Sequence, residues 1–166
     1  MKFPPVHHRV HLNLGVVFLR QKNLNRAREE FLHELYINPT EEKALNNLGI
    51  VCLREGHFQQ ATKPLQEALR LKPYFEDARL NLSQAYFQWA LAQAMADSID
   101  QAITNFRTAI KYDRDNPLAY YNLGLAYARK GRYNEALNEM KITVTLDPDF
   151  KPAKKILSGV ESLTPE

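Results

Sequence analysis

The feature that most constrains the fold is an internal repeat with a period of 34 residues. Four segments align with one another, and three of them are 34 residues long, whereas one is 41 residues long through an insertion of seven. The segments are 8–41, 42–75, 76–116 and 117–150. Units of this size cannot bury an apolar face alone, so the period predicts a stack in which neighbouring units share one core.

Side chains repeat together with the lengths. Position 7 is always leucine, and position 8 is small: Leu14, Leu48, Leu82 and Leu123, followed by Gly15, Gly49, Ser83 and Gly124. Position 20 is always alanine: Ala27, Ala61, Ala102 and Ala136. Position 32 is proline in three segments: Pro39, Pro73 and Pro148. Position 11 is usually aromatic: Phe18, Cys52, Tyr86 and Tyr127. Positions 7 and 11 share one helical face, small residues allow two helices to cross closely, and proline cannot extend a helix. Each segment therefore predicts two antiparallel helices.

These residues make the chain resemble the tetratricopeptide repeat family over residues 8–150. The resemblance implies an all-α fold, a right-handed superhelical solenoid of four helix pairs whose first helices line a concave groove. Residues 151–163 predict one further helix that caps the last pair. We expect 1–7 to be a lead-in and 164–166 a tail.

Two irregularities interrupt the pattern. The seven extra residues lie between Tyr86 and Ala102, which is about two helical turns, so we expect this helix pair to project beyond its neighbours. Asp97 and Ser98 predict the turn and the N-cap between the two helices. Pro64 falls inside a second helix and predicts a kink there, because proline lacks a backbone donor.

Position 6 is asparagine in all four repeats: Asn13, Asn47, Asn81 and Asn122. An amide both donates and accepts hydrogen bonds, which suits it to pairing with the backbone of an extended peptide. The arrangement is similar to the asparagine ladder of O-linked N-acetylglucosamine transferase repeats, which implies peptide binding in the groove. The alternative is that these amides bridge neighbouring repeats.

Basic residues accompany the asparagines along the first helices. Position 13 is arginine in three repeats, and two further cations precede it: Arg20, Arg54 and Arg129, with Arg9 and Lys43. Guanidinium groups pair well with carboxylates, so we expect an acidic or mixed apolar and acidic peptide. The alternative is a solvated charged surface. Trp89, Leu91 and Met95 predict either a second contact surface or packing within the lengthened pair.

Composition and charge exclude several classes of protein. Lysine and arginine number 22 against 19 aspartate and glutamate, an excess too small to indicate nucleic-acid binding. Apolar runs fall short of the roughly 18 residues that a membrane helix needs, so we expect no membrane insertion and a cytoplasmic location. The single cysteine, Cys52, excludes an intrachain disulfide and occupies a core position.

Catalytic and metal-binding motifs are weak. His7 and His11 have the spacing of a helical metal site, but a third ligand at a suitable spacing is missing. We expect a non-catalytic module without metal or cofactor, whose partner is a protein or peptide. The alternatives are self-assembly into a homo-oligomer through an uncapped N-terminal face or the inserted tip, and the recognition arm of a larger enzyme.

Overall fold

The computed structural model describes residues 9–161, and within this range the chain forms α-helices joined by short turns, without a strand. The helices are α1 (Val10–Arg20), α2 (Leu24–Ile37), α3 (Glu42–Arg54), α4 (Phe58–Leu71), α5 (Glu76–Met95), α6 (Ile99–Tyr112), α7 (Pro117–Arg129), α8 (Tyr133–Leu146) and α9 (Lys151–Glu161). The predicted all-α repeat fold is confirmed. The expected lead-in 1–7 and tail 164–166 lie outside the described residues.

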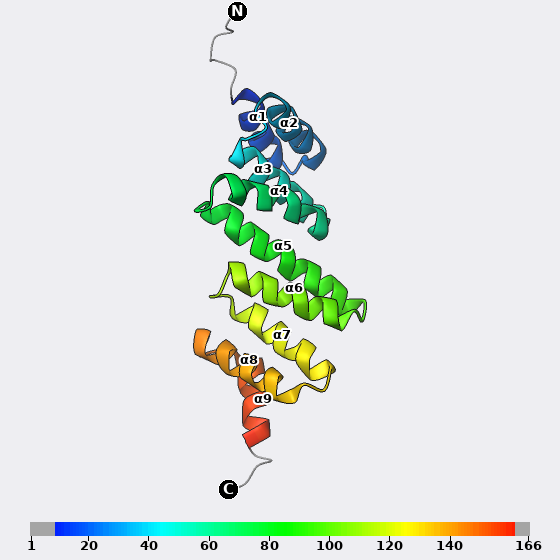
Figure 1. Ribbon diagram of the computed structural model, residues 1–166, viewed down its shortest axis with the longest axis vertical. Helices are drawn as coiled ribbons and strands as arrows, with labels where there is room; N and C mark the ends of the chain where they lie inside the picture. The colour runs from blue at the N-terminus through cyan, green and yellow to red at the C-terminus, as the bar shows by residue number, and fades with distance from the viewer. Residues whose placement is uncertain (1–8, 162–166) are drawn as a thin grey trace, which may run out of the picture. The chain divides into compact units, whose positions relative to one another are not determined.

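The chain divides into two compact units, residues 1–85 and 86–166, and the division falls inside α5. Within each unit, consecutive helices pack side by side in chain order (Figure 1). In the first unit, one apolar cluster joins α1, α2 and α3 around Phe31 and Val51. In the second unit, Phe87, Phe106 and Tyr127 belong to a cluster that joins α5, α6 and α7.

The repeated small residues lie where two helices of a pair cross. The alanines at position 20 are at most 6% exposed: Ala27, Ala61, Ala102 and Ala136. A Cβ added to Gly15 would lie 2.5 Å from Cε1 of Phe31, which is itself fully buried. The glycine at position 8 is therefore required by the close approach of the second helix, as the pattern predicts.

The seven-residue insertion lengthens only the first helix of its pair. α5 has 20 residues, whereas α6 has 14, the same length as α2, α4 and α8. Ser98 is the N-cap residue of α6, as expected, although its side chain makes no capping hydrogen bond.

The expected projection of the whole pair is wrong within the second unit. Arg129 Nη1 of α7 lies 2.8 Å from the carbonyl oxygen of Ala94, so the last turns of α5 and α7 lie beside each other. Seven residues make almost two complete helical turns, so the insertion preserves the helical phase of α5.

Proline 64 is accommodated inside α4, which continues as one helix from Phe58 to Leu71. At the other end of the chain, the predicted capping helix appears as α9, which packs against α8. Ala153 of α9 is fully buried, whereas Lys154 and Lys155 face solvent. This distribution fits a helix that covers the end of a stack.

Candidate functional site

The predicted asparagines have different environments. In the first unit, Asn13 is exposed on α1 and Asn47 is half-buried on α3. The side chains of these two residues make no hydrogen bond within residues 9–161. Their amides are therefore available to pair with another chain.

The other two asparagines are engaged by the protein itself. Asn81 Nδ2 donates to Asn46 Oδ1 at 2.9 Å and thereby bridges α5 to α3 in the first unit. Asn122 Nδ2 donates to the carbonyl oxygen of Leu118 at 2.8 Å, within its own helix. The bridging alternative thus describes Asn81, and a role of any of the four in peptide binding stays a prediction.

Two of the predicted arginines connect successive first helices. Arg54 Nη1 donates to the carbonyl oxygen of Leu19 at 2.9 Å, and Arg129 Nη1 donates to that of Ala94 at 2.8 Å. Leu19 and Ala94 occupy the last turns of α1 and α5, where helix carbonyls lack intrahelical partners and carry partial negative charge. Position 13 is therefore an inter-repeat staple, a role that sequence reasoning missed although the arginine recurs.

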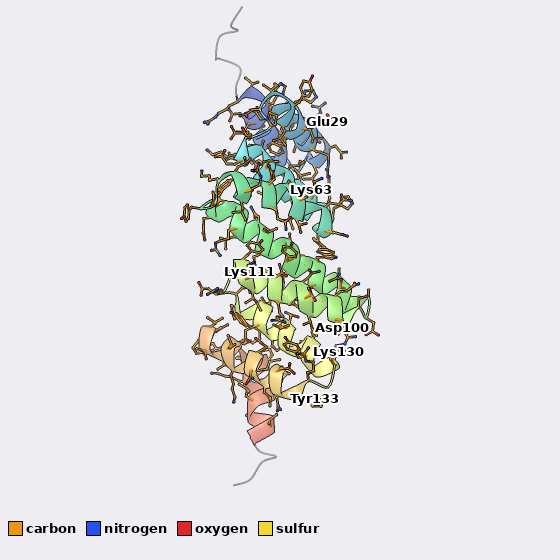
Figure 2. The ribbon with its side chains drawn as sticks, viewed as in Figure 1. Glu29, Lys63, Asp100, Lys111, Lys130 and Tyr133 are labelled. Carbon is orange, nitrogen blue, oxygen red and sulfur yellow. The ribbon has the colours of Figure 1, made fainter. Side chains whose placement is uncertain are left out.

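The remaining predicted cations are free. Arg9, Arg20 and Lys43 are exposed in the first unit and make no side-chain hydrogen bond or ion pair within the described range. Arg129 forms an ion pair with Asp97 at 2.7 Å. Lys130, which directly follows α7, forms an ion pair with Asp100 at 3.0 Å, and Figure 2 labels these two residues. The basic side chains of α7 are thus neutralised locally, unlike those of α1.

The second unit contains an apolar pocket between α5 and α7, with Phe106 of α6 at its floor. We call it the α5–α7 pocket, and its volume is about 260 Å³. It is lined by Leu91, Ala94, Met95, Phe106, Asn122, Leu125, Ala126 and Arg129. Met95 is 89% exposed at its edge, so this pocket offers apolar surface to solvent.

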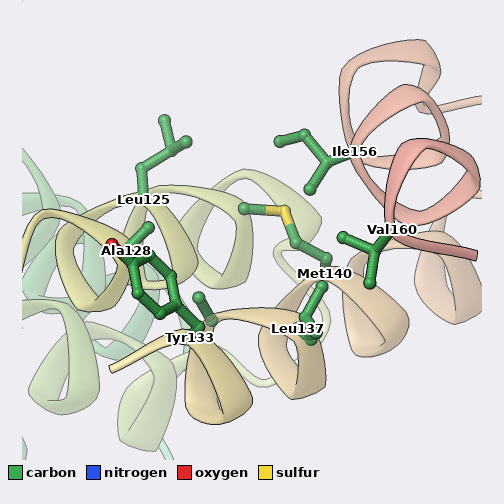
Figure 3. A pocket seen from close by; sticks show the side chains of 8 residues that line it. Leu125, Ala128, Tyr133, Leu137, Met140, Ile156 and Val160 are labelled. Carbon is green, nitrogen blue, oxygen red and sulfur yellow. The ribbon is translucent and has the colours of Figure 1, made fainter. Parts of the chain in front are cut away.

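A second pocket of about 260 Å³ lies between α7 and α9 over α8, and we call it the α7–α9 pocket. Figure 3 shows Leu125 from α7, Met140 from α8, and Ile156 and Val160 from α9 around a common space. The full lining is Leu125, Ala128, Tyr133, Ala136, Leu137, Met140, Ile156 and Val160. Leu125 belongs to both pockets, so α7 separates two adjacent apolar sites.

The two pockets are the same site in successive repeats. Phe106 and Met140 occupy position 24 of their repeats. Allowing for the inserted seven residues, Leu91 and Ala94 of α5 correspond to Leu125 and Ala128 of α7.

The inserted segment is divided between packing and exposure. Trp89 stacks against Tyr86 with ring centroids 6.2 Å apart, which supports the packing alternative for this residue. Leu91 and Met95 instead line the α5–α7 pocket. Leu91 and Met95 therefore share a pocket with Asn122 and Arg129, and their role as a second contact surface stays a prediction.

Titratable groups near these sites are perturbed by ordinary causes. Burial raises the pKa of the Glu139 carboxyl on α8, and Arg107 partly offsets this effect. Cys52 is buried, with the Arg28 guanidinium nitrogens 4.0 Å from its sulfur. Among residues 9–161 no cluster of three potential metal ligands occurs, and His11 instead pairs with Glu30 at 2.7 Å.

None of the described helices combines the length and the apolar character that crossing a bilayer requires.

The fold and the repeated pockets define an all-α helical-repeat protein. Three family models agree, because residues 97–131 match a TPR repeat model and residues 117–150 and 2–42 match tetratricopeptide repeat models. The chain therefore carries tetratricopeptide repeats.

Solved structures share this fold at low sequence identity. A crystal structure of MamA protein is 23% identical, with a TM-score of 0.65 over 88% of this chain and 76% of that one. A tetratricopeptide repeat protein from Parabacteroides merdae is 18% identical, with a TM-score of 0.64 over 88% of this chain and 56% of that one. At these identities the likeness establishes the fold.

Proposed function

We propose that the chain is a protein-interaction module that binds a peptide segment of a partner protein through the two pockets beside α7. Tetratricopeptide repeats are in general non-catalytic interaction modules. The observation that carries the proposal is the pair of apolar pockets that meet at Leu125, each open to solvent and of about 260 Å³. Concave apolar surface exposed to solvent is typical of sites that bind another protein or a ligand.

The chemistry of the lining defines the segment. Apolar side chains of the ligand would enter the pockets on either side of Leu125, where full burial of one aliphatic side chain contributes about 1.5–3 kcal/mol. Asn122 offers its amide oxygen beside the α5–α7 pocket, because its nitrogen is already bonded to Leu118. A ligand backbone N–H is the matching donor.

The first unit carries its own polar set of predicted binding residues. Within residues 9–161 the side chains of Asn47, Arg9 and Lys43 make no hydrogen bond or ion pair, so they are available to an acidic ligand. We keep these residues, together with Asn13, as the peptide-binding set of the first unit. Arg54 and Arg129 contribute less, because each already binds a carbonyl oxygen.

A displayed library of random peptides, selected on the full chain, tests the proposal. Selected peptides should carry separated apolar residues, and Leu125→Gln should weaken their binding by about tenfold, because one apolar contact in each pocket is lost. Leu118→Gln is the matched control, since Leu118 is another exposed leucine of α7 and lines neither pocket. Equal binding by both variants, or the absence of any enriched peptide, would contradict the proposal.

A further inference from the structure

The two pockets beside α7 differ in polarity at one repeat position. Position 6 of the helix that closes the α5–α7 pocket is Asn122, whereas position 6 of α9, counted from Lys151, is Ile156 in the α7–α9 pocket. The other residue that each closing helix contributes at a shared position is apolar, namely Ala126 in one pocket and Val160 in the other. An amide therefore lines one pocket where a hydrocarbon side chain lines the next.

The amide oxygen of Asn122 is a free acceptor. Asn122 Nδ2 donates to the carbonyl oxygen of Leu118 at 2.8 Å, and because a carbonyl oxygen only accepts, this bond fixes which end of the amide is the nitrogen. Oδ1 accepts no hydrogen bond within residues 9–161. It has two lone pairs, so it can accept from the backbone of a ligand and from a ligand side chain together. A side chain that enters this pocket thus meets an acceptor.

The charged residue of the same lining is already paired. Arg129 donates through Nη1 to the carbonyl oxygen of Ala94 at 2.8 Å and through Nη2 to Asp97 at 2.7 Å. A ligand carboxylate would have to compete with these partners for the guanidinium. The chemistry left open by the α5–α7 pocket is therefore that of an apolar side chain with one hydrogen-bond donor.

The size and the floor of the α5–α7 pocket favour an aromatic side chain. A cavity of about 150 Å³ lined by aliphatic and aromatic side chains holds one benzene ring. The α5–α7 pocket, at about 260 Å³, has room for two fused rings. Phe106 offers an aromatic ring at its floor, and Met95 offers at its edge a thioether, which packs favourably against aromatic rings. Indole meets these requirements, since it has two fused rings and a single N–H donor.

On the basis of the proposed peptide-binding function, we propose that the α5–α7 pocket selects a tryptophan side chain of the ligand, whose indole N–H donates to Asn122 Oδ1. The α7–α9 pocket has Ile156 at the equivalent position and takes an apolar side chain without a donor. The two anchoring side chains of the ligand are therefore chemically different. Their order along the ligand fixes the direction in which it lies across α7.

The probes are two ring compounds of the same shape, indole and benzofuran, in which an oxygen atom replaces the N–H group. Each is titrated into the full chain and followed by methyl NMR. Leu91 reports on the α5–α7 pocket and Leu137 on the α7–α9 pocket, because each lines one of the two pockets (Figure 3). The Leu91 signal should give a dissociation constant about fivefold lower for indole than for benzofuran. The Leu137 signal should show no preference for indole.

Replacing the acceptor should remove this preference. Asn122→Ile copies the residue of the neighbouring pocket, so indole and benzofuran should then give equal dissociation constants at Leu91. The same variant should lose the enrichment of tryptophan among peptides selected from the displayed library. Asn138→Ile is the matched control and should keep the preference, because Asn138 is exposed on α8 and lines neither pocket.

Three results would overturn the inference and leave the proposed function standing. The first is equal binding of indole and benzofuran at Leu91 in the unmodified protein. The second is a preference for indole that persists in Asn122→Ile. The third is a set of selected peptides in which tryptophan is not enriched. Binding of neither probe at either pocket would contradict the proposed function and this inference together.

Discussion

An added methyl group at Gly49 would lie 2.5 Å from Cγ of Leu65 and 2.7 Å from its Cδ2, and Leu65 is fully buried. We therefore expect Gly49→Ala to lower the free energy of unfolding by about 1–3 kcal/mol through overpacking. Gly159→Ala is the matched control, because nothing lies within 4 Å of its added Cβ. That variant should be neutral or slightly stabilising, since alanine favours helix. If urea unfolding showed Gly159→Ala to be less stable than Gly49→Ala, the close contact between Gly49 and Leu65 would be contradicted.

The half-buried carboxyl of Glu139 gives a prediction with a defined sign. Burial raises its pKa above the ordinary value of 4.5, so the folded state holds this proton more tightly than the unfolded state. At neutral pH the charged carboxylate then destabilises the fold, and the penalty disappears as pH falls through the raised pKa. Glu139→Gln should increase stability at neutral pH and leave it unchanged below pH 4.5.

Glu135→Gln provides the opposite case on the same helix. A hydrogen bond from Arg132 lowers the pKa of Glu135, so its contribution to stability is present at neutral pH and is lost as pH falls through the lowered pKa. Thermal melting across this pH range measures both variants. If the stability of the two variants, relative to the unmodified protein, changed with pH in the same direction, the opposite pKa shifts assigned to Glu139 and Glu135 would be contradicted.

At the scale of the element, the staple at position 13 connects one first helix to the next. Arg54→Gln removes the charged donor to Leu19, and we expect a loss of about 1 kcal/mol in the free energy of unfolding. Hydrogen exchange at the end of α1 should accelerate, because the last-turn carbonyls lose a partner. Arg70→Gln breaks only an exposed pair with Glu67 and should lower the free energy of unfolding less than Arg54→Gln does. If both variants lost the same free energy of unfolding, the hydrogen bond from Arg54 to Leu19 would contribute no more to stability than an exposed ion pair.

Helix pairs were predictable because their determinants are local and repeated. The alanine at position 20 and the glycine at position 8 predict, from sequence alone, that the two helices of a pair cross closely. The effect of the insertion was not predictable in the same way. Its length fits two turns, but only the contact of Arg129 with Ala94 shows that α5 ends level with α7.

The candidate site was predicted less completely than the fold. The position-6 and position-13 residues were identified as facing outward from the core, yet Asn81, Arg54 and Arg129 bind neighbouring helices. Sequence spacing gives the side of a helix but does not distinguish a ligand from the next repeat, since both lie on that side. The two pockets could not be predicted from the sequence, because the walls of each come from three helices.

At the scale of the whole molecule, the two units present different surfaces. The first unit has free amides and cations on α1 and α3. The second unit has apolar pockets whose neighbouring charges are paired, as in Arg129 with Asp97. We therefore expect binding to the second unit to depend little on salt, and binding of an acidic ligand to the first unit to weaken as the salt concentration rises.

The most direct test of this account is a methyl NMR titration of the full chain with a peptide selected from the displayed library. The account predicts that the signals of Leu91, Leu125 and Ile156 shift together as the peptide is added, because these residues line the two pockets beside α7. Val16 of α1 and Ile50 of α3 occupy the repeat position that Leu125 occupies in α7. Shifts confined to these two residues of the first unit, with the three pocket signals unchanged, would contradict the account.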